Sequence, residues 1–179
     1  RGDIERIAAE IRGEIGIPLD NARTFILSAR ADRIEQRHDG SFAILDYKTG
    51  QPPTGKQVRM GLSPQLTLEA AILREGGFEG IDAGSSVGEL VYVRLSGNNP
   101  PGEQRTLELK IRSNDTPQRP DEAADYALEQ LEALISHDGS RTLVLVFLAG
   151  SQAERVATFA RLEPELRESF PGVELGGPI

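Results

Sequence analysis

Residues 44–50 read Ile-Leu-Asp-Tyr-Lys-Thr-Gly, and this stretch decides how the rest of the chain is interpreted. The segment from Ser41 to Lys48 has the composition of a β-strand, and a Gly/Pro-rich loop follows it at residues 50–55. Side chains two apart on a strand point to the same face. Asp46 and Lys48 are therefore predicted to share a face, with Cβ atoms about 6–7 Å apart.

A second strand is predicted just before this one, from Thr24 to Gln36, where apolar and polar residues alternate. Asp39-Gly40 between them is a turn dipeptide typical of hairpins, so the two strands should pair antiparallel. If Asp32 faces the same side as Asp46, two carboxylates and Lys48 meet at one end of the sheet. Two hard oxygen ligands with open positions suit Mg²⁺, which activates water and neutralises phosphate charge. A nearby lysine can position that water or stabilise the developing charge.

The remaining segments alternate between helical and strand patterns. Helices are predicted at residues 4–15, from Ser63-Pro64 to Gly76-Gly77, at 120–135 and at 151–170; strands are predicted at 87–95, at 106–111 and, fully buried, at 142–148. This order predicts an α/β (α+β) fold, a mixed central sheet flanked by helices. We expect residues 1–150 to form one domain, with residues 151–179 as an unassigned C-terminal helix and tail.

The amino-acid composition excludes several kinds of binding and chemistry. The 20 basic and 28 acidic residues give a net charge of −8, which excludes a basic coat as the main device for binding nucleic acid. Cysteine is absent, which excludes disulfides, thiolate metal sites and a cysteine nucleophile and is compatible with the cytoplasm, the expected location. No apolar run approaches the length of a membrane span, so no membrane partner is expected. The chain begins with Arg1, and we expect it to be a segment of a longer polypeptide.

The combined motifs resemble a known family. Arg30-Ala-Asp-Arg-Ile34, the Asp-Gly turn, Ile44-Leu-Asp-Tyr-Lys-Thr-Gly50 and the later Pro64-Gln-Leu66 are similar to the PD-(D/E)XK nuclease superfamily, which has a restriction-endonuclease-like core. More narrowly, they look like the nuclease domain of RecB and of the AddA/AddB helicase–nucleases that process double-strand breaks. Leu68-Glu-Ala-Ala71 and the lack of cysteine look most like the AddB branch. The resemblance covers residues 24–112 best.

This resemblance implies a Mg²⁺-dependent deoxyribonuclease, with Mn²⁺ as an alternative ion, that cuts single strands supplied by an AddA-like helicase partner and leaves a 5′-phosphate. It implies Asp32, Asp46 and the carbonyl of Tyr47 as metal ligands. Lys48 would be the catalytic lysine, and Gln65 would contact DNA or the attacking water. Related sequences often carry a tyrosine four residues after that glutamine, where this chain has Glu69. Many relatives add an upstream ligand, for which Glu10, Glu14 or a residue outside this chain are candidates.

Interpretations without a catalytic role for these residues stay open. Asp46 and Lys48 alone are also compatible with a solvated ion pair at a strand end. Arg30 and Arg33 are either surface charges or phosphate contacts, and Lys56 and Arg59 are candidates for a DNA groove. As a whole, the chain is alternatively a non-catalytic module that binds DNA or docks a subunit on the same fold, or a free-standing restriction-type or phage-type nuclease. Glu35, on the face opposite Asp32, is expected to face solvent.

Overall fold

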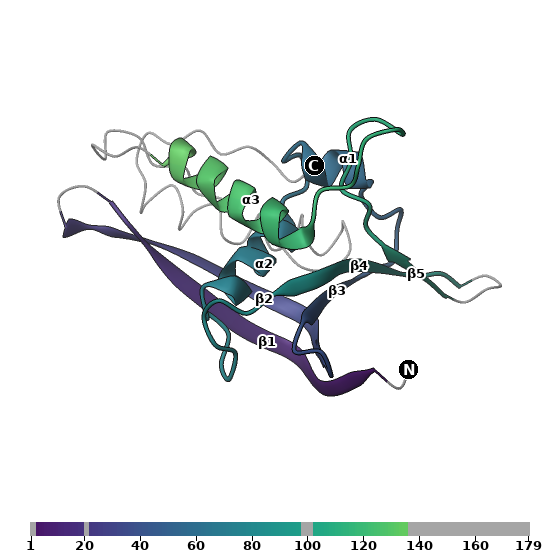
Figure 1. The fold of residues 1–179 in the computed structure, drawn as a ribbon, viewed down its shortest axis with the longest axis horizontal. Helices are drawn as coiled ribbons and strands as arrows, with labels where there is room; N and C mark the ends of the chain where they lie inside the picture. Colours follow the sequence, from purple (N-terminus) through teal and green to yellow (C-terminus); the bar gives the residue numbers. More distant parts are fainter. Residues whose placement is uncertain (1–2, 20–21, 98–101, 136–179) are drawn as a thin grey trace.

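A single mixed sheet organises the molecule (Figure 1). In a computed structural model, which describes residues 3–19, 22–97 and 102–135, the sheet has five strands in the order β1-β2-β3-β4-β5. The strands are β1 (Ile4–Pro18), β2 (Thr24–Arg37), β3 (Phe42–Lys48), β4 (Val87–Leu95) and β5 (Gly102–Thr106). β3 and β4 run parallel and all other neighbours antiparallel. The predicted α/β class with a mixed sheet is confirmed.

In the part of the chain that the structure describes, three helices accompany the sheet: α1 (Gly55–Arg59), α2 (Gln65–Arg74) and α3 (Pro120–Leu134). The crossover between the parallel strands β3 and β4 contains α1 and α2, as parallel pairing requires a long connection. Every residue of α2 from Leu66 to Leu73 is buried, because α2 packs between the sheet and α3 (Figure 1). Ile34, Ile44 and Leu90 of the sheet join α2 and α3 in one apolar cluster. This packing fixes α2 over the ends of β2 and β3.

The helix predicted at residues 4–15 is wrong, because this segment is strand β1. Its isoleucines fit a helical stripe, but Ile7 is 52% exposed, so the stripe does not form one buried face. Instead Ile11, Gly13, Ile15 and Ile17 alternate toward the core. β-branched side chains favour strands, and β2 offers a partner along nearly its full length. The hairpin with β2 therefore overrides the local helical pattern.

Smaller differences occur at the ends of elements. α2 begins at Gln65 with Pro64 as its N-cap, slightly later than the predicted start at Ser63-Pro64. Its predicted stop is confirmed: Glu75 caps the helix and Gly76 follows with φ +74°. The partner of β4 ends at Thr106 rather than beginning there, since the chain leaves the sheet to bury Leu109.

Some expectations fall on other parts of the chain. The strand predicted at 142–148, the helix at 151–170 and the tail unit 151–179 lie outside the described residues. Among the helices of the described part, none is both long and apolar enough to cross a membrane.

Candidate functional site

Asp32 and Asp46 are placed across from each other by the hairpin of β2 and β3. The last paired residues before them are Arg33 and Leu45, and extending this antiparallel register by one step sets Asp32 opposite Asp46. The backbone N–H of Tyr47 donates to Oδ2 of Asp32 at 2.9 Å. The Asp32 side chain thus takes a backbone donor at the point where the β2–β3 ladder ends.

Asp46 is a buried carboxylate, 3% exposed, in the middle of the sheet. Its Oδ1 accepts hydrogen bonds from Lys48 Nζ at 3.0 Å and from Gln65 Nε2 at 2.9 Å. Its Oδ2 is ion-paired with the same Nζ at 2.8 Å but accepts no hydrogen bond. Burial raises the pKa of Asp46, and Asp32 adds to this, while Lys48 and Gln65 act in the opposite direction.

Lys48 ends β3 and points to the same cluster. Besides Asp46, its Nζ donates to Oε1 of Gln65 at 3.2 Å. It also lies 5.9 Å from the ring centre of Tyr92, a residue of β4 that pairs with Asp46, and this distance suits a cation–π contact. The Lys48 side chain is 25% exposed, so the ammonium sits at the boundary between the buried acids and solvent.

α2 contributes Gln65 from its first turn and Glu69 one turn later. Gln65 Nε2 donates both to Asp46 and to Glu69 Oε1, the latter at 3.1 Å. Glu69 is 2% exposed, and burial raises its pKa to about 8, with smaller upward contributions from Asp46 and Asp32. Its Oε2 has no hydrogen-bond partner. The inclusion of Glu69 in the cluster was missed from sequence, although its i,i+4 spacing from Gln65 was a usable signal.

The structure therefore brings Asp32, Asp46, Lys48 and Gln65 together, along with Glu69. Tyr47 lies between Asp46 and Lys48 on β3. Its backbone N–H donates to Asp32, while its side chain lies on the opposite face of the sheet, where its hydroxyl accepts a hydrogen bond from Arg33.

Other residues considered from sequence lie elsewhere. Glu10 pairs with Arg30 at 2.6 Å on the exposed part of the β1–β2 hairpin, and Glu14 pairs in register with Ser28. The expectation that Glu35 faces solvent is wrong: it is 5% exposed and ion-paired with Arg33. These charges make no contact with the cluster among the interactions of the described residues.

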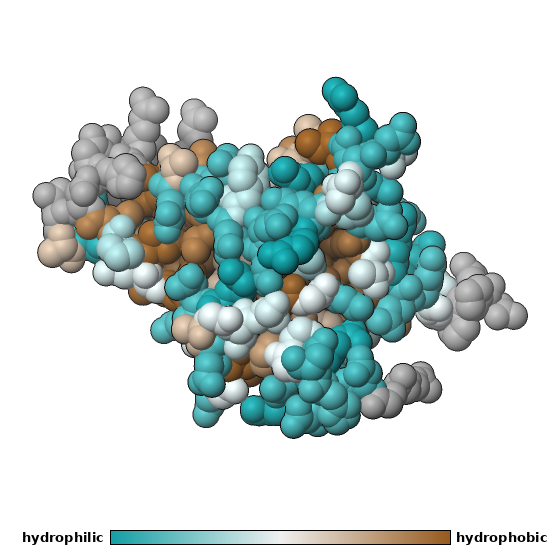
Figure 2. Space-filling model, in the orientation of Figure 1, coloured by the Kyte–Doolittle hydropathy of each residue, from teal (hydrophilic) through white to brown (hydrophobic). Residues whose placement is uncertain are grey.

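Helix α1 carries two further candidates, the exposed Lys56 and the half-buried Arg59. The Arg59 guanidinium lies 5.1 Å from the ring centre of Tyr126, so this side chain packs against α3. Lys56 stays a candidate for contact with a polyanion. Figure 2 shows hydrophilic side chains over much of this face of the molecule, with apolar surface gathered around α3.

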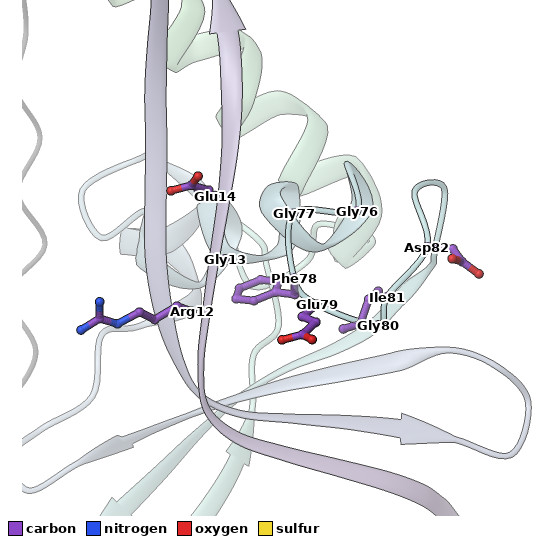
Figure 3. Close-up of a pocket in the computed structure, with 10 residues that line it drawn as sticks. All are labelled: Arg12, Gly13, Glu14, Gly76, Gly77, Phe78, Glu79, Gly80, Ile81 and Asp82. Atoms are coloured by element: carbon purple, nitrogen blue, oxygen red, sulfur yellow. The ribbon is translucent and has the colours of Figure 1, made fainter.

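A separate hollow does not coincide with the acid cluster. Figure 3 shows this cavity of about 500 Å³, lined by Arg12–Glu14 of β1 and residues 76–82. In this cavity the ring of Phe78 packs against Gly13, which has no side chain. None of the cluster residues lines it, so it forms no part of the candidate site.

The cluster supplies only some of the ligands that a hard divalent cation needs. Within residues 3–19, 22–97 and 102–135, no group of three or more His, Asp or Glu side chains is close enough to hold a metal ion by itself. Two facing acids, Asp32 and Asp46, with a buried Oδ2 on Asp46 that accepts no hydrogen bond, do suit an ion such as Mg²⁺ that keeps several waters. The donor set is all oxygen, which favours Mg²⁺ or Mn²⁺ over softer metals.

Comparison with known proteins adds three findings. A family model described as the PD-(D/E)XK nuclease superfamily matches residues 2–167. Proteins of Rickettsia bellii (strain RML369-C) and Rickettsia typhi (strain ATCC VR-144 / Wilmington), each named only as uncharacterized, are 37% identical over 116 residues and 42% identical over 78 residues. These matches cover 64% and 44% of this chain but only 13% and 9% of the relatives, so the chain spans a small part of their length. The crystal structure of SSO0001 is 13% identical, with a TM-score of 0.39, and the match covers 73% of this chain and 52% of that one.

Proposed function

The chain belongs to the PD-(D/E)XK nuclease superfamily, and from this premise we propose that it is a metal-dependent deoxyribonuclease domain that hydrolyses DNA phosphodiesters. The single observation that carries the proposal is the contact set in which Lys48 Nζ touches both Asp46 and Gln65 beside the Asp32 carboxylate. A lysine, an amide and two acids converge there on the helix-bearing side of the sheet. Outside a functional site, burying the Asp46 and Glu69 carboxyl groups, each with one oxygen that accepts no hydrogen bond, would only cost stability.

In this proposal each residue has a defined task. Asp32, Asp46 and the Tyr47 carbonyl would hold the cation, which supplies an acidified water and neutralises charge on the phosphate. Lys48 Nζ orients the attacking water and stabilises the negative charge that develops on the phosphate oxygens. Gln65 keeps Nζ in place through its Oε1. Water attacks phosphorus in line, the P–O3′ bond breaks, and the products carry a 5′-phosphate and a 3′-hydroxyl.

The decisive variant is Lys48→Ala. We expect Mg²⁺-dependent cleavage of a single-stranded oligonucleotide to fall about 100-fold or more, the size typical of losing one electrostatic or acid–base group. Circular dichroism and Mn²⁺ binding should be retained, because Lys48 is neither a core residue nor a ligand. Lys110→Ala, which removes a lysine paired with Glu108 away from the cluster, is the control and should cleave normally. Undiminished cleavage by Lys48→Ala contradicts the catalytic assignment.

We further propose that this nuclease domain works in double-strand break repair as part of an AddB-like helicase–nuclease with an AddA-like partner. The motif set of residues 30–66 supports a helicase–nuclease of this kind, and Leu68-Glu-Ala-Ala71 with the lack of cysteine supports the AddB branch. The matched segment is also a small part of much longer relatives. A borrowed basic channel would also offset the net charge of −8, since DNA affinity depends on neutralising phosphates. The expected result is that duplex DNA is degraded only when an ATP-driven helicase partner is added. ATP-independent degradation of duplex DNA would contradict this role.

The acidic charge favours a second candidate, a non-catalytic module that docks a subunit on the same fold. Calorimetric titration with Mn²⁺ separates the two. A nuclease site should bind the ion, and Asp46→Asn should abolish that binding. A docking module should show no metal binding in either protein while still binding its partner.

A further inference from the structure

Glu69 is an unusual acid for its position. It lies in the buried run of α2, is 2% exposed, and has one carboxylate oxygen, Oε2, without any partner. A polar group in such a place costs free energy unless it is hydrogen-bonded. The other oxygen, Oε1, accepts from Gln65 Nε2 at 3.1 Å. This contact connects Glu69 to the cluster.

The amide of Gln65 can satisfy its neighbours in only one orientation. Its Nε2 has two hydrogens, which go to Asp46 Oδ1 at 2.9 Å and to Glu69 Oε1. Its Oε1 accepts from Lys48 Nζ, which is a donor only. A flipped amide would set its oxygen against the Asp46 carboxylate and its NH₂ against the Lys48 ammonium. In the observed orientation Asp46 and Glu69 Oε1 both accept from Nε2, and Oε1 faces Lys48.

We propose that Glu69 is a positioning residue: by holding Gln65 Nε2 it locks the Gln65 amide, and the locked amide fixes Lys48 Nζ beside Asp46. This rests on the proposed function, because it supposes that Lys48 acts in cleavage. Glu69 itself touches neither the substrate nor the reacting atoms. What the site requires from position 69 is an acceptor oxygen, and a negative charge is not needed.

Two variants separate the acceptor from the charge. Glu69→Gln keeps an oxygen that accepts from Gln65, whereas Glu69→Met keeps the length of the side chain and removes the acceptor. We expect Glu69→Met to lower kcat on single-stranded DNA about 10- to 100-fold, the range for residues that orient a reacting group. KM and the Mn²⁺ dissociation constant should stay within about twofold. Glu69→Gln should retain kcat within about threefold, and Glu129→Met, an exposed glutamate on α3, is the matched control.

A second measurement works without any cleavage. In the metal-free wild type, nuclear magnetic resonance should show Gln65 side-chain amide protons that exchange with water at least about tenfold more slowly than those of the exposed Gln51. Glu69→Met should remove this protection and Glu69→Gln should preserve it. If the wild-type protein does not cleave DNA but this pattern holds, the proposed function fails, while the locking of the Gln65 amide by Glu69 stands as a structural contact.

Three results would overturn the proposal. Equal exchange for Gln65 and Gln51 in the wild type would mean that the amide is not locked, and this result needs no variant to fold. Normal kcat in a folded Glu69→Met would mean that the lock is not used. Loss of both kcat and Mn²⁺ affinity in Glu69→Gln would make Glu69 an anionic metal ligand instead.

Discussion

Burial gives the Glu69 carboxyl its pKa of about 8, against an ordinary value of 4.5, and this has a consequence for stability. Between these two pH values the folded protein keeps the proton that the unfolded chain releases. The folded state then binds more protons, so the free energy of unfolding falls as pH rises through this window. The slope from this one group is at most about 1.4 kcal/mol per pH unit.

Glu69→Gln removes the titrating group and should flatten this dependence. Urea unfolding between pH 5 and pH 8, in buffer containing a chelator, is the measurement. We expect the variant to lose clearly less stability over this range than the wild type, with Glu129→Gln as the control for loss of one acidic side chain. Equal losses in wild type and Glu69→Gln would show that the buried carboxyl does not hold its proton.

At the same scale, the sequence was informative where geometry is local. The spacing of Asp46 and Lys48 predicts a shared face from strand alternation alone, and the Asp-Gly turn sets the partner strand that carries Asp32. Gln65 followed from the family resemblance. Glu69 entered the cluster for a reason that no local pattern contains: α2 packs flat against the sheet and α3, so that even its polar positions are buried.

At the scale of elements, β1 shows how a pattern misleads. Isoleucine at positions 4, 7, 11 and 15 satisfies a helical period, yet Ile11, Ile15 and Ile17 also satisfy a strand period with Gly13 between them. Local periodicity cannot choose between these readings. The choice is made by β2, which pairs with β1 from Thr24 to Arg37, and by Phe78, whose ring occupies the space above Gly13. Neither partner lies within the segment of residues 4–15 whose periodicity is read.

This makes Gly13→Ala a test of the β1 packing. A Cβ at this position would lie 2.4 Å from a ring carbon of Phe78, which is 1% exposed and held in the core. The ring and its loop must shift, so we expect a loss of about 1–3 kcal/mol in the free energy of unfolding, measured with urea. Gly50→Ala is the matched control, since no heavy atom lies within 4 Å of its added methyl. A neutral Gly13→Ala would argue against β1 lying under Phe78.

β5 was misplaced for a different reason. Its residues Gly102–Thr106 are all exposed and carry no apolar alternation, so the sequence offers no periodic signal there. The alternating Leu107, Leu109 and Ile111 mimic a strand. They instead lead the chain away from the sheet edge, with Leu109 1% exposed and bridged to Gln118. A pattern of buried and exposed positions cannot predict an edge strand that is held by backbone hydrogen bonds alone.

At the scale of the whole molecule, the acids of the candidate site come from different strands that share one core. Asp32 belongs to β2 and Asp46 to β3, and both strands join α2 and α3 through the same apolar cluster. The class of the fold was predictable because helices and strands alternate along the chain. The way in which α2 covers the ends of β2 and β3 was not, since it depends on packing among Ile44, Leu66 and Leu90, which are far apart in sequence.

Because a bound cation would link two strands of this single core, it should stabilise the entire domain. An ion that binds only the folded state adds about 2.7 kcal/mol when its concentration is 100 times its dissociation constant. We expect Mn²⁺ or Mg²⁺ to raise Tm by several degrees in thermal unfolding followed by circular dichroism. NaCl at the same ionic strength separates site binding from general screening of the net charge of −8. In Asp46→Asn the increment beyond NaCl should disappear, because the buried carboxylate, whose Oδ2 accepts no hydrogen bond, is gone. An equal rise in Asp46→Asn would place the ion elsewhere on the acidic surface and remove the metal from the proposed site.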